Sequence, residues 1–428
     1  MSVDSYTAIQ PAFAKANPLP RWASKLREQG YPTMKNEDWH FTSAAPIAEA
    51  EFPVLLDNPG TVQAEDLLPF TFGHSEWPTL VFVNGRFAPA LSNRAALPGL
   101  TLLPLAEAFE SHDDVLERHL GKITTMDGQA FTALNTAFLG DGALVLVGKE
   151  MEIEHPVHLL FVTDATAART TLSPRVLVVA ERHSKATVLE SYVSLGEAPY
   201  LTNVVTEAEV ADGATLHHYR LQRESPRAFH VGTMEARQGR DSHLLQFSFV
   251  MGGALSRQNV YTGLQGEGCG ATLNGLYMLT DEQHCDHQTR IEHAQPNCYS
   301  REVYKGILDG SSHGVFNGKV YVHAIAQKTD GKQTNNTLLL SERAHIDTKP
   351  QLEIFADDVK CTHGATVGRI DQTALFYMKS RGVGAEMARK LLTYAFAADV
   401  LETIECEPVK VGLEALTLER FAGAEATA

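Results

Sequence analysis

The middle of the chain alternates between short runs of apolar, β-branched residues and turn residues. From about residue 143 to residue 368, runs such as GALVLVG, VHLLFVT, RVLVVAE and KVYVHA are bounded by Gly, Asp or Pro. Val and Ile fit the pleated surface of a sheet, whereas Gly and Asp favour turns. No apolar stripe of helical spacing and useful length interrupts these runs. The pattern therefore predicts one strand after another.

Small residues recur in this region at a nearly constant interval. If Ala186, Ala214, Ser242 and Ala271 are equivalent positions, their spacings are 28, 28 and 29 residues, whereas the later spacings, through Gly314, Ala344 and Ala365, are irregular. Such a repeat is typical of a parallel β-helix, in which each coil buries its apolar face against the next. A β-sandwich is the alternative, but it needs hairpins, and few Asn-Gly or Asp-Gly pairs separate these strands. We predict a mainly β protein with a parallel β-helix core over residues 129–368.

The residues before this core have a mixed pattern, which favours a mostly helical N-terminal domain over residues 1–128. RWASKLREQG predicts a helix that Gly30 ends. TLVFVNGRF predicts a pair of strands joined by a turn at Asn84-Gly85. GQAFTALNTAFLGD predicts a short helix where the core begins.

A helical pattern returns after residue 368 and predicts a C-terminal helical domain over residues 369–428. Its apolar stripe consists of Ala388, Leu392, Phe396, Val400 and Ile404, with Leu391 and Ala395 beside them. The stripe begins after Gly382 and Gly384 and ends before Pro408, and GLEALTLERFAG predicts a second helix. The stripe either caps the open end of the β-helix or forms a docking surface for a partner. Both interpretations can be correct if they concern opposite faces of the helix.

The charge balance limits the classes of partner. The 428 residues include 36 Lys and Arg against 52 Asp and Glu, which gives a net charge of -16. An acidic chain repels phosphate backbones and anionic lipids, so we expect neither nucleic acid nor membrane as a partner. No apolar segment is long enough to span a bilayer, and the first residues do not resemble a secretory signal. Five cysteines do not suggest a disulfide framework, so we expect a reducing cytoplasm.

Two residues near the end of the core are candidates for metal or sulfur chemistry. In FADDVKCTHGATVG, Cys361 and His363 are two residues apart, so on an extended strand they point to the same side. A thiolate beside an imidazole can bind iron or carry persulfide sulfur. Val359 shares that side, so the alternative is that these residues point into the core, where free cysteines commonly lie.

A second group of ligand-type residues lies in DEQHCDHQTRIEHAQPNCYSRE. It contains His284, Cys285, His287, His293 and Cys298. These spacings match no standard zinc finger, and the role of the segment stays open. The chain also lacks a G-x-x-x-x-G-K-[ST] phosphate loop, a C-x-x-C pair and a G-x-S-x-G nucleophile motif.

The long block YKGILDGSSHGVFNGKVYVHAIAQKTDGKQTNNTLLLSERAHIDTKPQLEIFADDVKCTHGATVG resembles the SufB/SufD family almost without interruption. FYMKSRGV and MARKLLTYAFAADVL resemble the end of the family's chains, and GYPTMKNEDWHFT resembles its N-terminal signature. In the signature, the matching residues are Gly30, Pro32, Glu37, Trp39 and Thr42. The likeness touches all three regions.

The resemblance implies a right-handed parallel β-helix between two helical domains, and a scaffold without turnover of its own. It implies a complex in which the chain pairs with SufB through the β-helix and the ATPase SufC docks on the C-terminal helices. It also implies that a nascent iron–sulfur cluster forms transiently at the SufB interface, with Cys361 and His363 taking part in iron acquisition. A homodimer of the isolated chain, the cluster type and the binding of a reduced flavin stay open.

The block CTHGATVG resembles the SufD type of chain within the family. SufB-like chains have an acidic residue after the matching histidine, where this chain has Gly364. We therefore expect that this chain cannot complete the site alone.

Two other functions compete with the scaffold. A β-helix enzyme acting on polysaccharide would need clustered carboxylates, but Asp357 and Asp358 are adjacent, so on a strand they point to opposite faces. A metal-delivery protein would use the His284–Cys298 segment instead.

Overall fold

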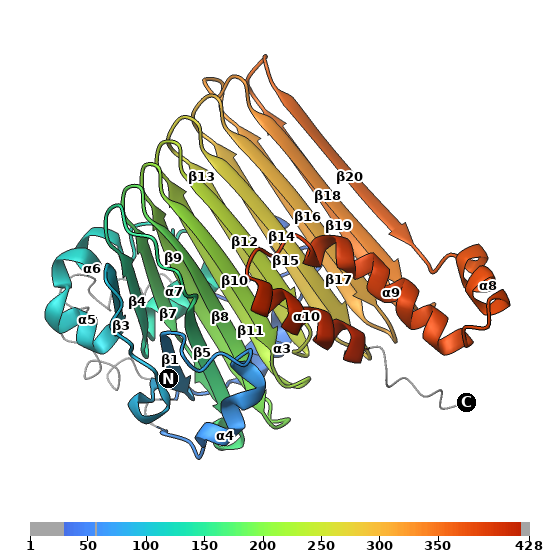
Figure 1. The fold of residues 1–428 in the computed structure, drawn as a ribbon, viewed down its shortest axis with the longest axis horizontal. Coiled ribbons are helices and arrows are strands. Elements are labelled where there is room, and N and C mark those ends of the chain that lie inside the picture. The colour runs from blue at the N-terminus through green and yellow to red at the C-terminus, as the bar shows by residue number, and fades with distance from the viewer. Residues whose placement is uncertain (1–29, 56–57, 421–428) are drawn as a thin grey trace.

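The computed structural model describes residues 30–55 and 58–420, and it shows a parallel β-solenoid whose chain passes back and forth between two long sheets (Figure 1). One sheet, called sheet B, consists in order of β2 (Arg86–Phe87), β1 (Thr79–Val83), β5 (Val157–Asp164), β8 (Lys185–Leu195), β10 (Thr215–Arg223), β12 (His243–Val250), β14 (Gly270–Leu279), β16 (Tyr299–Leu308), β18 (Asp330–Leu339) and β20 (Lys360–Gly368). The other, sheet A, consists of β19 (His345–Ile354), β17 (His313–Val322), β15 (His284–His293), β13 (Leu255–Leu264), β11 (Phe229–Gln238), β9 (Leu201–Val210), β7 (Arg175–Ala180), β4 (Gly142–Val147) and β3 (Leu100–Pro104), with β6 (Thr171–Leu172) beside β9. The predicted solenoid is confirmed and the sandwich alternative is wrong, while the right-handed sense of the coil stays a prediction.

The register of the coils corrects the repeat that the sequence suggested. Ala186 lies beside Leu216, and Ala214 lies beside Ser242, so Ala186 and Ala214 are two residues out of register. From Ala186 to Cys361, laterally equivalent residues of sheet B follow one another at intervals of 27 to 31 residues. The turns between coils vary in length, and this variation hides the register from a search for small residues.

Antiparallel pairing is confined to the first elements. β1 and β2 form the predicted hairpin, with Asn84 and Gly85 both at positive φ, as a type I′ turn requires. β3 pairs with β4 antiparallel, and β1 joins sheet B beside β5.

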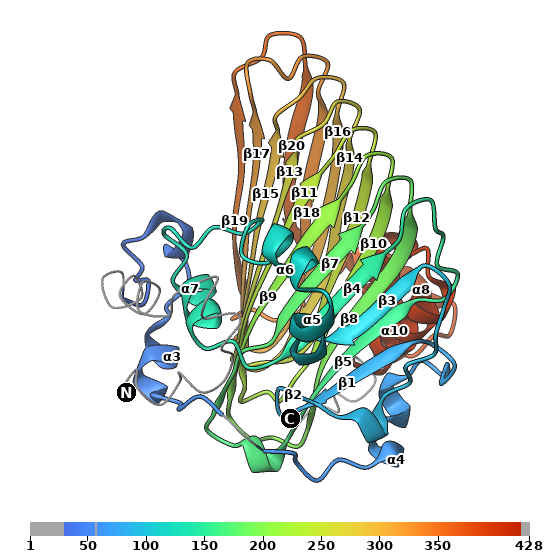
Figure 2. The ribbon, with the colours of Figure 1, turned by 90° about the vertical axis from the view of Figure 1, so that its left-hand side faces the viewer.

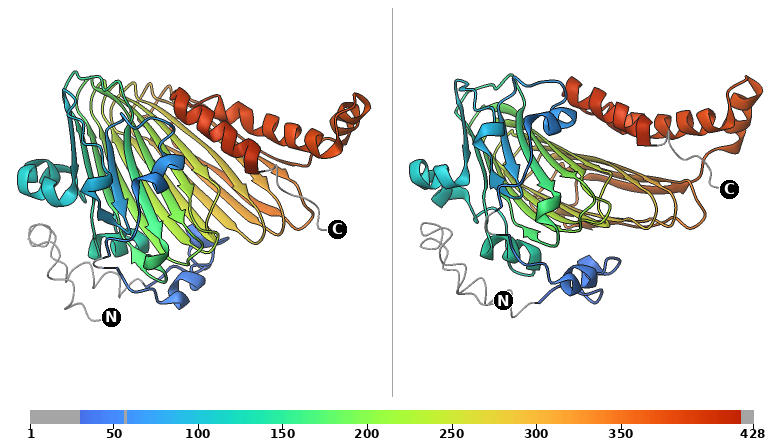
Figure 3. Two further views of the ribbon diagram at one scale, coloured as in Figure 1. Left: turned by 60° about the horizontal axis from the view of Figure 1, so that its bottom comes forward. Right: turned by 90° about the horizontal axis from the view of Figure 1, so that it is seen from below.

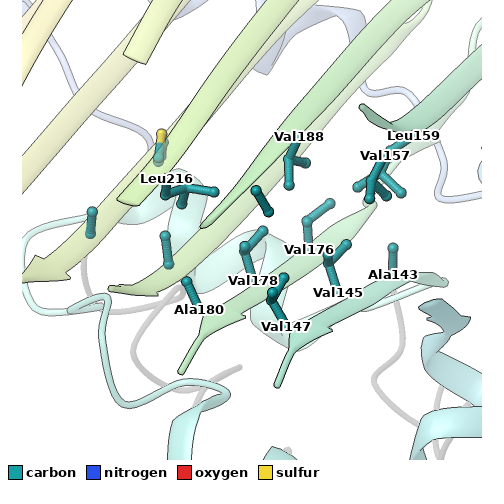
Figure 4. Close-up of a cluster of buried hydrophobic side chains, with 14 of the residues drawn as sticks. Ala143, Val145, Val147, Val157, Leu159, Val176, Val178, Ala180, Val188 and Leu216 are labelled. Atoms are coloured by element: carbon teal, nitrogen blue, oxygen red, sulfur yellow. The ribbon is translucent and has the colours of Figure 1, made fainter. Parts of the chain in front are cut away.

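The interior between the sheets changes character along the solenoid. In the first coils it is filled by aliphatic side chains that point toward one another, including Val145, Val178 and Val188 (Figure 4). In later coils the same inward positions hold buried polar residues such as Gln246, His287 and Glu302. Burying apolar groups stabilises the early coils, whereas the later interior depends on hydrogen bonds.

Most helices of the N-terminal part cover the outer face of sheet A (Figure 2), whereas α4 packs on outward side chains of β1 and β5 of sheet B. α5 and α6 pack on Leu144 and Leu177, and the predicted helix α7 packs with α3 on Val231 and Leu255. The elements of this part are η2 (Glu37–Trp39), α3 (Ala45–Ala50), α4 (Ala64–Leu67), η3 (Leu68–Phe70), η4 (Pro89–Leu91), α5 (Leu105–Ser111), α6 (Asp113–His119), α7 (Ala130–Ala137) and η5 (Ala165–Ala167). The helix expected before Gly30 lies outside the described residues.

The C-terminal helices α8 (Gln372–Ser380), α9 (Ala385–Leu401) and α10 (Glu407–Arg420) follow the last strand. α9 and α10 lie across the outer face of sheet B (Figure 3) and bury Val400, Leu401 and Leu413 against Phe247 and Phe249. The expectation that the stripe caps the open end is therefore wrong. The helices instead cover a cluster of outward apolar side chains on β10 to β16, such as Tyr219, Phe249 and Ile307. Residues 421–423 of the second predicted helix lie outside the described part.

Candidate functional site

Cys361 and His363 lie on β20, the last strand of the solenoid and the edge of sheet B (Figure 1). In register, Cys361 lies beside Gly331 and His363 beside Gln333 of β18. Gly331 and Gln333 are buried on the face turned toward the interior. Since alternate residues of a strand share a face, both candidate side chains are on this inward face.

The Cys361 thiol is half-buried against the interior of the last coil. Cys361 and Val359 both pack against the buried cluster that contains Val320 and Val322, as expected if Val359 shares the side of Cys361. Burial raises the pKa of the Cys361 thiol, a backbone hydrogen bond with Gly331 lowers it, and the Asp330 carboxylate raises it. The thiol therefore stays protonated near neutral pH until a metal ion or a positive group stabilises the thiolate.

A glycine makes room for this thiol. A Cβ atom at Gly331 would lie 3.4 Å from Cys361 Sγ and 3.5 Å from Ser300 Oγ. A Cβ atom would make ordinary contacts there, but a side chain that extends beyond Cβ would crowd the sulfur. Ser300 in turn contacts His293, whose Nε2 lies 3.0 Å from Ser300 Oγ.

A buried acid lies in the row that leads to His363. Glu302, Gln333 and His363 are lateral neighbours on three successive strands. Gln333 Nε2 donates to Glu302 Oε2 over 2.6 Å. Burial raises the pKa of Glu302 to about 7, although its side-chain hydrogen bonds act in the opposite direction. Glu302 can therefore hold a proton at neutral pH. His363, the last of the three lateral neighbours, is exposed.

The last coil is incompletely covered by the described residues. β19 and β20 are the edge strands of the two sheets, and each has a neighbour on one side only. Apolar side chains at inward positions of these two strands are exposed: the exposed fraction is 50% for Val367 and 37% for Ile354. Unpaired edges and exposed apolar groups are features of a surface that joins another chain.

The ligand-type residues of the His284–Cys298 segment do not form one site. β15 alternates its side chains, so Cys285, His287 and His293 point inward and are buried, whereas His284 points outward. Cys285 Sγ lies 3.6 Å from His287 Nδ1, and burial lowers the pKa of His287 to about 4. Cys298 lies in the turn just before β16 of sheet B and packs near Cys269.

The sequence did not predict one further cluster, a row of histidines on sheet A. His284, His313 and His345 begin three successive strands of sheet A and lie side by side. Together with Asp347 they form a row of polar residues on the outer face. The signal in the sequence was a histidine recurring about once per coil, but only the register shows that the three are neighbours.

The residues of the N-terminal signature dock beside this row. Trp39 covers the Arg257 guanidinium, and Thr42 is buried against Asp286 and His284. Glu37 forms an ion pair with Lys349, at 3.1 Å. The signature therefore fastens the N-terminal segment to the outer face of sheet A.

The C-terminal helices leave an apolar surface that we call the α8–α9 surface, defined by Phe376, Tyr377, Met387 and Leu391. Their exposed fractions are 72%, 58%, 51% and 40% in that order. The buried face of α9 differs from the predicted stripe. It includes Thr393 and Ala397, whereas Leu391 and Ala395 are exposed.

Among the described residues, no helix combines the length and apolar character that crossing a bilayer requires.

Comparison with known proteins identifies the family of this chain. Residues 161–396 match the family model for the SUF system FeS cluster assembly SufBD core domain, and residues 20–159 match the SufBD protein N-terminal region. The chain is 34% identical over 401 residues to the iron–sulfur cluster assembly protein SufD of Escherichia coli, covering 93% of this chain and 91% of that protein. It is 28% identical over 416 residues to the protein of the same name from Bacillus subtilis, with 93% and 94% covered. The chain therefore belongs to the SufBD family of iron–sulfur cluster assembly proteins.

Proposed function

We propose that this chain is a non-catalytic scaffold subunit that helps to build an iron–sulfur cluster at the open end of its solenoid. Cys361 and His363 act on this chain's side, and a SufB chain completes the site. The cluster is cargo that forms there transiently and leaves. The observation that carries the proposal is the position of Cys361 and His363 on the inward face of the uncovered last coil.

The chemistry of the two residues supports a shared site. A thiolate and an imidazole both suit iron, but a cluster iron takes about four ligands, so two side chains leave the remainder to sulfide or another protein. Because burial raises the pKa of Cys361, the thiol becomes a good ligand only when the site is completed by positive charge. The unpaired edges of β19 and β20 offer the backbone groups to which a second β-helix can add.

The same reasoning assigns the remaining partners. We propose that SufC, which supplies the ATP hydrolysis, binds the α8–α9 surface, because its apolar side chains are exposed and helix α8 and the start of α9 project beyond the solenoid (Figure 3, right). In the absence of SufB, the open end is also the surface through which two copies of this chain would pair. We propose the cytoplasm as the place of action, since iron–sulfur assembly needs reduced thiols.

Anaerobic cluster reconstitution in the purified complex with SufB and SufC tests the proposal. Cys361→Ala and His363→Ala are expected to leave the complex and its melting curve intact but to lower bound iron and visible absorbance. Cys406→Ala is the matched control, because Cys406 is a partly buried thiol that packs beneath the C-terminal helices. Full cluster yield in both site variants would show that the two residues are only structural.

A further inference from the structure

Three histidines of successive coils form a continuous row on the outer face of sheet A. The rings of His284 and His313 have centroids 4.6 Å apart, and those of His313 and His345 are stacked at 4.0 Å. Asp347 follows His345 by two residues, so its side chain is on the same face of β19. The row lies on the opposite side of sheet A from the solenoid interior and is built independently of Cys361.

The hydrogen bonds of the row fix where its protons lie. Thr42 Oγ1 donates to Asp286 Oδ2 over 2.5 Å, so it must accept from His284 Nε2, which lies 2.9 Å away. A neutral imidazole carries a single proton, and the contact with Thr42 places it on His284 Nε2. His284 Nδ1 is then an acceptor, and His313 Nδ1, at 3.1 Å, is its donor.

This order of donors brings two acceptors together. With its proton on Nδ1, a neutral His313 has a lone pair on Nε2, and that atom lies 2.8 Å from Asp347 Oδ2. Two lone pairs at this distance repel each other unless a positive charge lies between them. A second proton on His313 is one solution, but it leaves out His345, whose ring stacks on that of His313 and which offers a ligand atom within 4.8 Å of those of His313 and Asp347. A metal cation is the other solution.

We propose that His313, His345 and Asp347 bind a divalent first-row transition metal ion, with His284 as the residue that orients His313. One ligand atom of each residue lies within 4.8 Å of the others. Neighbouring ligands at about 2.1 Å from a metal are about 3 Å apart, which is close to the His313–Asp347 separation. His345 is exposed and can turn its ring toward the ion.

The ligand set indicates which metals suit the site. Two histidines and one carboxylate leave open coordination positions, an arrangement that suits Fe(II). The hydrogen bond from His313 Nδ1 to His284 is the kind of outer contact that fixes the ring of a metal-ligating histidine. Metal binding as such does not depend on the proposed scaffold function. The choice of iron as the natural occupant does rest on it, because β19 reaches the open end where the cluster is proposed to form.

The test uses the full-length isolated chain, titrated without oxygen at pH 7.5 with Co(II) as a spectroscopic probe and then with Fe(II). We expect one Co(II) per chain with visible absorption bands from mixed nitrogen and oxygen ligands. His313→Ala, His345→Ala and Asp347→Asn should each weaken binding by about tenfold or more, while melting curves remain close to that of the parent. His284→Ala should weaken it less than His313→Ala, because His284 acts only through His313.

Two matched controls separate this site from metal binding elsewhere on the chain. His323 contacts Glu292 at 2.6 Å as a surface histidine–carboxylate pair, and His323→Ala should leave Co(II) binding unchanged. Cys361→Ala should also leave it unchanged, whereas it lowers cluster yield in the complex if the scaffold proposal holds. Absence of Co(II) binding, or binding that survives both His313→Ala and Asp347→Asn, would overturn the metal site. A proton shared by His313 and Asp347 would then be the explanation for their close contact.

Discussion

The guanidinium carbon of Arg257 lies 3.9 Å from the centre of the Trp39 ring, so a residue of the N-terminal signature covers a charge on the solenoid. Arg257 is 1% exposed and also pairs with Asp286 at 2.5 Å. Trp39 also stacks on Phe131 of α7, with ring centres 5.3 Å apart. This contact holds the N-terminal segment on the sheet that bears the histidine row.

Replacing Trp39 by alanine should loosen this segment without unfolding the solenoid. The change removes the ring stacking and a cation–π contact that contributes about 2 kcal/mol when the charge is desolvated. We expect native-state hydrogen exchange to show a lower opening free energy for residues 37–47 and little change in β11 to β17. Trp39→Phe keeps an aromatic face and should lose less than half as much. Equal exchange in all three proteins would mean that the contact contributes nothing.

The buried acid Glu302 should make stability fall as the pH rises. Its pKa is raised from 4.5 to about 7 in the folded chain, so the folded state holds a proton that the unfolded state releases. This stabilisation is complete below about pH 4.5 and is lost as the pH rises through 7, by up to about 3 kcal/mol.

Glu302→Gln keeps the shape and stays neutral, so it should be more stable than the parent at pH 8 and similar to it at pH 5. Thermal melts of both proteins at several pH values measure this difference, and the buried histidines cancel in the comparison. A constant difference from pH 5 to pH 8 would contradict the assignment of the proton to Glu302.

Filling the space at Gly331 should disturb the candidate site while leaving Cys361 in place. A valine there would crowd Sγ, because the first added atom already lies 3.4 Å from it. We expect Gly331→Val to lower cluster yield in the complex with SufB and SufC. The control is Gly368→Val on the neighbouring strand, where an added Cβ meets nothing within 4 Å. Equal yields from both variants would argue against a role for the thiol at this position.

A charge on the α8–α9 surface should weaken the binding of SufC. Phe376→Asp and Leu391→Asp alter exposed side chains, so we expect intact melting curves together with binding about tenfold weaker or worse, because central apolar contacts dominate interfaces. Val411→Asp is the control, since Val411 is an apolar residue of α10 that is 53% exposed outside this surface. Binding of all three variants at the parent's strength, measured by calorimetry, would place SufC elsewhere.

The sequence by itself determined those features that depend on neighbours along the chain. Strand alternation placed Cys361 and His363 on one side, and Asn84-Gly85 specified a turn whose backbone needs positive φ. The four-residue spacing in α9 likewise predicted a helix with one apolar face, because helical periodicity is local.

Only the tertiary structure decided which residues of different coils lie side by side. Ala186 pairs with Leu216 rather than Ala214, because turn length and lateral packing set the register and neither has a fixed period. The same register brings His313 beside both His284 and His345, although about 30 residues separate each pair. It also decided that the C-terminal helices cover sheet B and leave the last coil open, because that choice depends on the apolar outer face that the stacked strands create together.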